Sequence, residues 1–205
     1  MSSDHRDQYY WRAKRDQFRS RAAYKLEFLI ERYGIIKDGQ AVLEIGSSPG
    51  GWTQVLVDHG CRVVAVDIQP MDEIPGVIFL KLNILREDAA ERIREEMARS
   101  LVQRFDVVLS DAMAKTSGIR SSDHAASVMI GNAVMKIAMD TLRRGGVAVV
   151  KQFQGDMTGD FIKNWGHYFR DHRITKPPAS RKESSEVYII FYGFSGKETD
   201  NSVQG

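Results

Sequence analysis

The chain has 205 residues, a length that suits one α/β domain with a well-buried core. Its formal net charge of +2 at pH 7 does not demand a polyanionic partner, so any basic surface must be local. No apolar stretch approaches the length of a membrane span, and the N-terminus is too charged for a secretory signal. The single cysteine excludes an intrachain disulfide and suits the cytoplasm, and the five scattered histidines lack metal-ligand spacing, so we expect no metal site.

The first 20 residues form a polar arm in which basic and aromatic side chains are interleaved. Basic groups of this kind can meet phosphates while aromatic faces stack on unpaired bases. A partly frayed arm whose aromatic side chains dock on the protein body explains the same residues, and this segment alone favours that interpretation. Residues 20–33 then predict a helix, with Ser20 as its N-cap, Gly34 as its stop and Lys25 beside its apolar stripe.

Residues 41–67 predict a strand, a glycine turn, a helix and a second strand. The first strand ends at Gly46, the turn reads Gly-Ser-Ser-Pro-Gly-Gly, and the second strand ends in Asp67. Such a unit presents backbone amides and a carboxylate to a nucleoside-containing cofactor. Because Pro49 removes one amide donor, a ligand without a phosphate at the turn fits better than a dinucleotide. A turn that is merely tight remains the alternative.

The rest of the chain continues the alternation of strands and helices, which favours a mostly parallel sheet with helices on both faces. We expect further strands at 77–82, 105–109, 147–150, 172–175 and 186–192, helices at 87–100, 125–142 and 159–169, and a flexible loop at 116–124. In such folds ligands bind beyond the carboxyl ends of the strands. The residues expected at those ends are Gly46, Asp67, Asn83, Asp111 and Lys151.

Lys151 directly follows the apolar run 147–150, so its ammonium group must emerge at the site or form a pair inside the protein. Asp111, which ends a neighbouring strand, is the obvious partner. A desolvated lysine whose pKa is lowered can serve as a general base. A purely structural Lys–Asp pair explains these two residues equally well.

Four segments together resemble the FtsJ/RrmJ family, also called RlmE: Glu44–Trp52, Ser110-Asp111, 149–155 and 184–189. Members of this family are S-adenosylmethionine-dependent ribose 2′-O-methyltransferases that act on large-subunit ribosomal RNA. The resemblance runs from about residue 19 to residue 193. It implies a Rossmann-like methyltransferase domain at 21–193, with a seven-stranded, mostly parallel sheet whose last strand is antiparallel. The arm at 1–20 and a polar tail at 194–205 flank this domain.

The resemblance also implies roles for individual residues. The catalytic set, called the tetrad below, falls on Lys25, Asp111, Lys151 and Glu186. In this scheme Lys151 accepts or steers the proton of the acceptor hydroxyl, and Asp111 anchors Lys151 beside the cofactor. Lys25 and Glu186 hold the ribose and Lys151. The contacts to S-adenosylmethionine fall on Gly46, Gly50, Trp52, Asp67, Asn83 and Asp111. The sequence departs from the family at Asn83, where an acid is usual, and at 112–115.

The implied activity is 2′-O-methylation of a uridine ribose in 23S-type ribosomal RNA, by a cytoplasmic monomer acting on the large subunit. With RNA as the substrate, phosphate contacts are expected from a basic set: Arg12, Lys14, Arg15, Arg19, Arg21, Arg181 and Lys182. Three alternatives remain. They are the same chemistry on transfer RNA or a cap-proximal ribose, a non-catalytic RNA-binding ribosome assembly factor, and a nicotinamide oxidoreductase, which Pro49 disfavours.

Overall fold

A computed structural model describes residues 8–181 and 184–196. In chain order these residues form α1 (Gln8–Arg15), α2 (Ala23–Tyr33), β1 (Ala41–Ile45), α3 (Gly51–Asp58), β2 (Arg62–Asp67), β3 (Ile78–Lys81), α4 (Ala89–Arg99), β4 (Phe105–Ser110), α5 (Arg120–Thr141), β5 (Leu142–Phe153), α6 (Thr158–Gly166), β6 (Phe169–Thr175) and β7 (Glu186–Phe194). None of the helices in these two ranges is long and apolar enough to cross a membrane.

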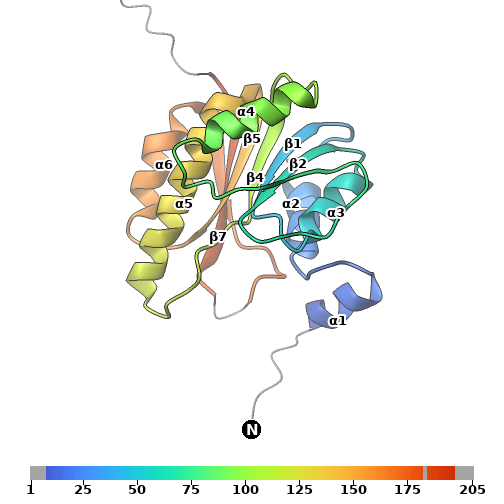
Figure 1. Cartoon of the computed structure of the whole chain (residues 1–205). Helices are drawn as coiled ribbons and strands as arrows, with labels where there is room; N and C mark the ends of the chain where they lie inside the picture. The colour runs from blue at the N-terminus through green and yellow to red at the C-terminus, as the bar shows by residue number, and fades with distance from the viewer. Residues whose placement is uncertain (1–7, 182–183, 197–205) are drawn as a thin grey trace, which may run out of the picture.

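The strands form one seven-stranded sheet in the order β3-β2-β1-β4-β5-β7-β6 (Figure 1). The pairs from β3 through β5 are parallel, whereas β7 runs antiparallel to both β5 and β6. The predicted fold class, a mostly parallel sheet with an antiparallel last strand, is therefore confirmed.

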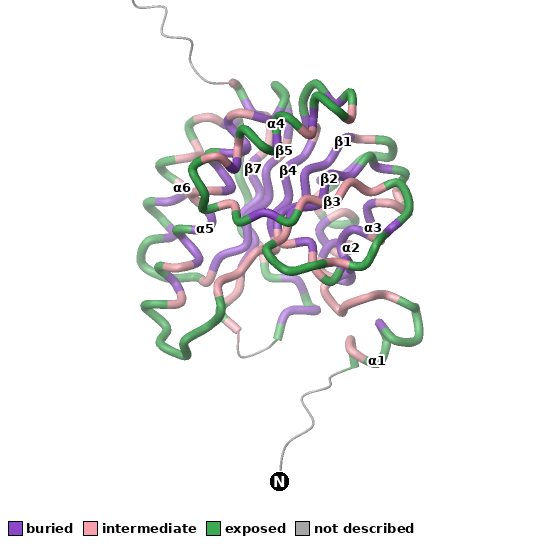
Figure 2. Tube along the Cα trace, viewed as in Figure 1, coloured by how far each residue is buried: buried purple, intermediate pink, exposed green. Residues whose placement is uncertain are grey.

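Helices cover both faces of the sheet, and the strands between them are largely buried (Figures 1 and 2). α2 and α3 pack on one face around Leu26, Trp52 and Leu56, while α4, α5 and α6 pack on the other around Ile93, Val134 and other apolar side chains. Because both faces are covered, all five residues of β1 are buried. The carboxyl edge of the parallel strands is left open for a site.

Gly46 shapes the exit from β1 at this edge. Its φ is +82°, in the left-handed region, and a Cβ atom there would lie 2.4 Å from the backbone nitrogen of Ala112. Only glycine permits this close approach without moving the backbone. The segments after β1 and β4 therefore lie against each other where the glycine turn begins.

Several predicted boundaries are wrong. α2 begins at Ala23 and its cap residue, Ala22, makes no side-chain cap, so Ser20 is not the N-cap. α5 begins at Arg120, so residues 120–124 are helical and not part of a flexible loop. β5 runs from Leu142 to Phe153, which places Lys151 inside the strand and not at its end, because β7 pairs with β5 through Phe153. Residues 1–7 of the predicted arm and most of the predicted tail lie outside the described ranges.

Candidate active site

Lys151 and Asp111 form a buried ion pair at the carboxyl edge of the sheet. The Lys151 Nζ lies 2.9 Å from Asp111 Oδ1 and also donates a hydrogen bond to the Asp111 carbonyl oxygen at 2.5 Å. Burial opposes ionisation of the Asp111 carboxyl, but the charges of Lys151 and Lys25 and a hydrogen bond from Tyr188 together hold its pKa below the ordinary value. Asp111 is therefore ionised at neutral pH.

A second ion pair joins α2 to β7 beside the first. The Lys25 Nζ lies 2.5 Å from Glu186 Oε1, and their side chains are only 11% and 12% exposed. The Ser180 hydroxyl donates to the same carboxylate oxygen at 3.1 Å. The sequence places Lys25 beside the apolar stripe of its helix, and in the structure its side chain points to Glu186.

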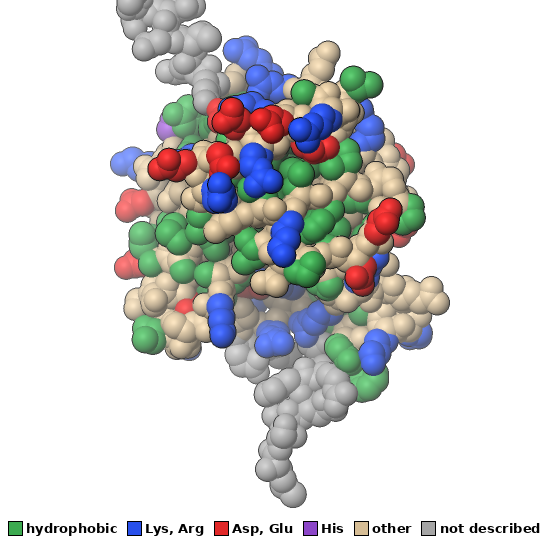
Figure 3. All heavy atoms as spheres, viewed as in Figure 1, with side chains coloured by type: hydrophobic (Ala, Val, Ile, Leu, Met, Phe, Trp, Pro, Cys, Tyr) green, Lys and Arg blue, Asp and Glu red, His purple; other side chains and the backbone are tan. Residues whose placement is uncertain are grey.

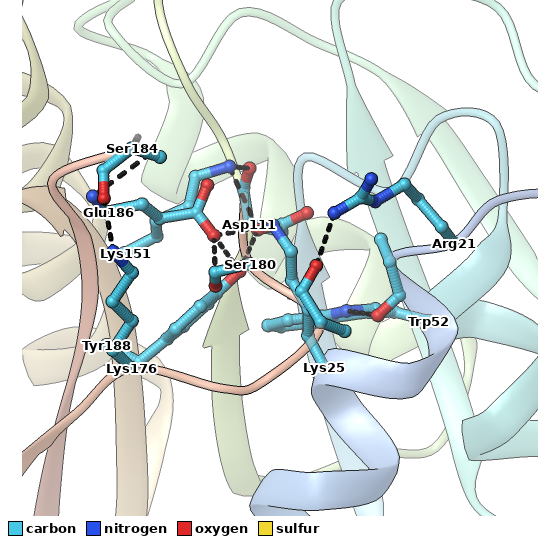
Figure 4. A network of polar contacts seen from close by, with 12 residues as sticks. Arg21, Lys25, Trp52, Asp111, Lys151, Lys176, Ser180, Ser184, Glu186 and Tyr188 are labelled. Carbon is cyan, nitrogen blue, oxygen red and sulfur yellow. Dashed lines mark hydrogen bonds and ion pairs between the residues drawn. The ribbon is translucent and has the colours of Figure 1, made fainter. Parts of the chain in front are cut away.

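Tyr188 connects the two pairs (Figure 4). Its hydroxyl donates to Asp111 Oδ1 at 2.6 Å and lies 3.5 Å from Glu186 Oε1. Burial, reinforced by the two carboxylates, holds the pKa of Tyr188 well above its usual value, so the phenol keeps its proton. Tyr188 is not predicted as a site residue from the sequence, because an aromatic residue in an apolar strand is usually part of the core. Its spacing of two from Glu186, which puts both on one face of β7, was the available signal.

A pocket of about 280 Å³, called the glycine-turn pocket, is lined in part by Ala112, which directly follows Asp111 of the tetrad. Gly46, Asp67 and Asn83 line it, together with the apolar side chains of Ile68, Leu82, Met113 and Met129. Asp67 accepts hydrogen bonds from the backbone amides of Ser48 and Gln69, at 2.9 and 2.7 Å, and the Asn83 Oδ1 accepts one from the Leu85 amide at 3.0 Å. A larger hollow of about 810 Å³ between α4 and α5 adjoins this pocket but is lined by none of the predicted cofactor residues.

Three predicted cofactor residues, Gly50, Trp52 and Asp111, do not line this pocket, and Asp111 instead pairs with Lys151. Gly50 caps α3 with a φ of +109°, and the Arg19 side chain packs over it. The Trp52 indole is 2% exposed, donates to the Ala22 carbonyl at 2.8 Å and lies 5.7 Å from the Tyr188 ring. The Trp52 side chain thus packs against Tyr188, and its contact with the cofactor stays a prediction.

The model of the FtsJ-like methyltransferase family matches residues 18–194 of this chain. The chain belongs to this family. The resemblance drawn from the four sequence segments is thereby confirmed, and the protein is a methyltransferase.

Similar proteins extend this finding. The methyltransferase is 49% identical to the ribosomal RNA large subunit methyltransferase E of Picrophilus torridus, over 91% of this chain and 96% of the relative. It is 43% identical to the protein of the same name from Archaeoglobus fulgidus, over 91% and 95% of the two chains. A crystal structure of a Plasmodium falciparum protein assigned as a ribosomal RNA methyltransferase matches with a TM-score of 0.80 and 27% identity, covering 88% of this chain and all of that one.

The predicted phosphate-binding residues of the methyltransferase differ in their surroundings. The Arg19 guanidinium donates to the backbone carbonyls of Pro49, Asp72 and Glu73, so it fastens the glycine turn to the loop after β2. Arg21 donates to the Ala179 carbonyl and ties the start of α2 to the loop before β7. Both side chains therefore hold separate segments of the site together through hydrogen bonds to backbone carbonyls.

The other predicted phosphate contacts lie on or near α1 and the loop before β7. Arg12 and Arg15 pair with Asp16, Lys14 lies over the rings of Tyr10 and Trp11, and Arg181 is exposed. Lys182 lies outside the described ranges. Figure 3 shows Lys and Arg side chains along the lower rim of the molecule, at the carboxyl edge of the sheet. Ala13, Tyr24 and Ala179 form a small apolar cluster that packs α1 against α2 and this loop.

Glu44, in β1, is a buried acid with unusual surroundings. It is 1% exposed, its Oε2 accepts from the Thr53 hydroxyl at 2.6 Å, and its Oε1 has no hydrogen-bond partner among the described residues. Burial raises the pKa of Glu44 to about 8, with Asp111 and Asp67 adding to the effect and the Thr53 hydrogen bond opposing it.

Within the described ranges, no group of three or more acidic, histidine or cysteine side chains is arranged to hold a metal ion.

Proposed function

We propose that this protein transfers a methyl group from S-adenosylmethionine to the 2′-hydroxyl of a ribose in large-subunit ribosomal RNA, with a uridine as the target. The observation that carries the proposal is the pair of Lys–carboxylate bridges, joined through Tyr188, that lies beside the glycine-turn pocket. The name of the relatives, ribosomal RNA large subunit methyltransferase E, supports the choice of substrate.

The residues of the glycine-turn pocket fit S-adenosylmethionine. A carboxylate at the tip of the second strand, here Asp67, suits the hydroxyls of a nucleoside, and the apolar side chains of Ile68, Leu82 and Met129 suit an adenine ring. Asn83 would meet the adenine through its amide, whose oxygen keeps one lone pair beyond the bond from Leu85. The cofactor supplies a methyl group that is activated by a sulfonium charge.

The tetrad is placed to handle the acceptor hydroxyl. Lys151 uses two of its three N–H donors on Asp111, so the third is left for the ribose oxygen. Lys25 and Glu186 flank the same space and would hold the ribose. Two cations and two anions leave the tetrad with no net charge, so it does not repel a cationic sulfonium.

Magnitudes indicate that positioning dominates the chemistry. Alignment of reacting groups can account for about 7–11 kcal/mol of a barrier, whereas a general base contributes about 10²–10⁴-fold in rate. While it is protonated, Lys151 would therefore act mainly by fixing the hydroxyl oxygen and steering its proton. It accepts that proton only from its neutral form, in which two N–H groups stay on Asp111 and the lone pair faces the hydroxyl.

RNA would reach the tetrad across α1 and the loop before β7. We assign phosphate contacts to Arg12, Lys14, Arg15 and Arg181, which lie at this rim, with Lys182 left as a prediction from sequence. Arg19 and Arg21 are omitted because backbone carbonyls engage their guanidinium groups. Contacts of this kind orient the RNA without reading its sequence.

The decisive experiment measures transfer of tritiated methyl groups from S-adenosylmethionine to unmodified large ribosomal subunits. Lys151→Ala should lower the rate at least 100-fold, because it removes the group that holds the acceptor oxygen, while the cofactor Kd measured by calorimetry changes less than twofold. Lys163→Ala, at an exposed lysine of α6, is the matched control and should keep full activity. Undiminished activity of Lys151→Ala would refute this mechanism.

Mass mapping of the labelled RNA then separates the alternatives. A single 2′-O-methylated uridine in the large-subunit RNA is the expected product. Incorporation into transfer RNA instead would redirect the same chemistry to that substrate. Tight binding of the subunit without incorporation of any label would indicate a non-catalytic assembly factor.

A further inference from the structure

Phe153, the last residue of β5, is a half-buried aromatic side chain that the packing of the core does not explain. It joins none of the three apolar clusters formed by the described residues. Among the rings of residues 8–181 and 184–196 it makes no stacking or edge contact. A large apolar side chain that stays partly exposed beside a site indicates binding more strongly than a buried one does.

The alternation of β5 places the Phe153 side chain on the face of the tetrad. Val150 and Gln152 face α5, since a Cβ on Gly131 would lie 3.2 Å from Val150 Cγ1 and 2.8 Å from Gln152 Nε2. Lys151 and Phe153 therefore face the opposite side, where Lys151 meets Asp111.

The pairing of β5 with β7 gives the same placement. Lys151 pairs with Tyr188, and Phe153 pairs with Glu186. Directly paired residues of antiparallel strands share a face, with Cβ atoms about 4.5–5.5 Å apart. The Phe153 side chain thus starts beside that of Glu186, whose carboxylate holds Lys25.

Two side chains of α5, Ser127 and His124, hold the backbone of Phe153 in place through hydrogen bonds. Its N–H donates to the Ser127 hydroxyl at 3.1 Å, and its carbonyl lies 2.7 Å from His124 Nδ1. His124 Nε2 accepts from the Met157 amide at 3.1 Å, so the proton of the neutral ring is on Nδ1 and points to Phe153. A Cβ on Gly155 would lie 2.6 Å from the His124 ring, which explains the glycine of this segment.

We propose that Phe153 is the face on which the base of the target nucleotide stacks while its ribose lies between Lys151 and the Lys25–Glu186 pair. This inference rests on the proposed function, since it takes the ribose position from it. RNA-binding proteins commonly splay out an unpaired nucleotide and stack its base on an aromatic side chain. Because every base has a π-face, Phe153 contributes to binding the flipped nucleotide more than to identifying its base.

The first measurement compares kcat/KM on unmodified large ribosomal subunits for Phe153→Leu and Phe153→Tyr. Leucine keeps apolar volume but lacks the aromatic face, so we expect about a tenfold loss, whereas tyrosine should stay within twofold of the unchanged protein. The cofactor Kd should not change in either variant. Phe79→Leu, at a half-buried phenylalanine of β3 that packs in the core, is the matched control and should keep kcat/KM.

The second measurement separates stacking from a structural role. Two single-stranded RNA fragments spanning the mapped nucleotide are compared by fluorescence anisotropy, one with the target base and one with an abasic ribose. Phe153→Leu should weaken binding of the first about tenfold and leave the second unchanged. Equal weakening of both fragments, or no weakening of either, overturns the inference. The proposed function fails separately, when the unchanged protein incorporates no methyl group into the subunits.

Discussion

The glycine-turn pocket and the tetrad lie side by side at one edge of the sheet but are built in different ways. The predicted cofactor residues of the pocket come from the ends of adjacent parallel strands, within residues 45–85. The tetrad takes one side chain each from α2, β5 and β7 and one from the end of β4, and charge pairing holds them together. Backbone conformation therefore controls the pocket, whereas electrostatic partners control the tetrad.

Gly46→Ala should have the largest effect, because it acts on the backbone of the pocket. A left-handed φ disfavours alanine, and its Cβ would overlap the Ala112 backbone. We expect a loss of about 3 kcal/mol or more in the free energy of unfolding, measured by urea denaturation, and no measurable cofactor binding by calorimetry. Gly76→Ala has a similar φ of +79° with no heavy atom within 4 Å, so it should bind cofactor normally. Equal effects of the two substitutions would show that the close approach at Gly46 is unimportant.

Glu186→Gln tests the tetrad. Loss of this charge should impair catalysis and leave cofactor binding in the glycine-turn pocket unchanged. Lys25 would lose its ionised partner although its own side chain is only 11% exposed. We expect about a 100-fold fall in kcat, a cofactor Kd within twofold and a stability loss of about 1–3 kcal/mol. Asp171→Asn, which breaks an exposed pair with Arg173, should change none of these quantities. A tenfold weaker cofactor Kd for Glu186→Gln would show that the two regions are not separable.

Glu44→Gln should change how stability depends on pH. The folded protein holds the Glu44 proton up to about pH 8, whereas the unfolded chain releases it near its ordinary pKa of 4.5. Between these values the native state binds more protons, so its stability falls as pH rises from about 5 to 8. Each pKa unit corresponds to about 1.4 kcal/mol, so the total effect is on the order of a few kcal/mol. Urea denaturation across this range should show a flatter profile for Glu44→Gln, and an identical slope would contradict the assignment.

Asn83→Asp should have the smallest effect. It restores the acid that is usual in the family, and its carboxylate can accept both the Leu85 amide and an adenine amino group. We expect the cofactor Kd to fall about two- to fivefold with an unchanged kcat, measured by calorimetry and by methyl transfer. Weaker binding would indicate that the amide nitrogen of Asn83 makes the useful contact.

The predictions from sequence were most accurate where the structure depends on residues that are close together in the chain. The strand that ends at Gly46, the glycine turn and the strand that ends at Asp67 were predicted from local pattern alone. The start of α5 was not, because residues 120–124 are all polar and show no apolar helical stripe. They become helical where His124 is buried against the segment after β5, a contact that local propensity does not contain.

Residues whose role depends on distant segments were assigned less well. Arg19 reads as a phosphate contact in a basic arm, yet its guanidinium meets carbonyls about 30 and 50 residues away. The sequence around Tyr188 predicts a core residue, yet its hydroxyl contacts the carboxylates of two ion pairs. The roles of the tetrad came from the resemblance to a family, and they stay predictions until the variants are measured.

The register of β7 has a consequence for how this enzyme tolerates change. Glu186 and Tyr188 occupy alternate positions of one strand that is paired on both sides, to β5 and to β6. A slip of a single residue would turn both side chains to the α5 face together. A one-residue deletion within β7 should therefore abolish methyl transfer outright, even in a protein that still melts cooperatively and still retains its cofactor.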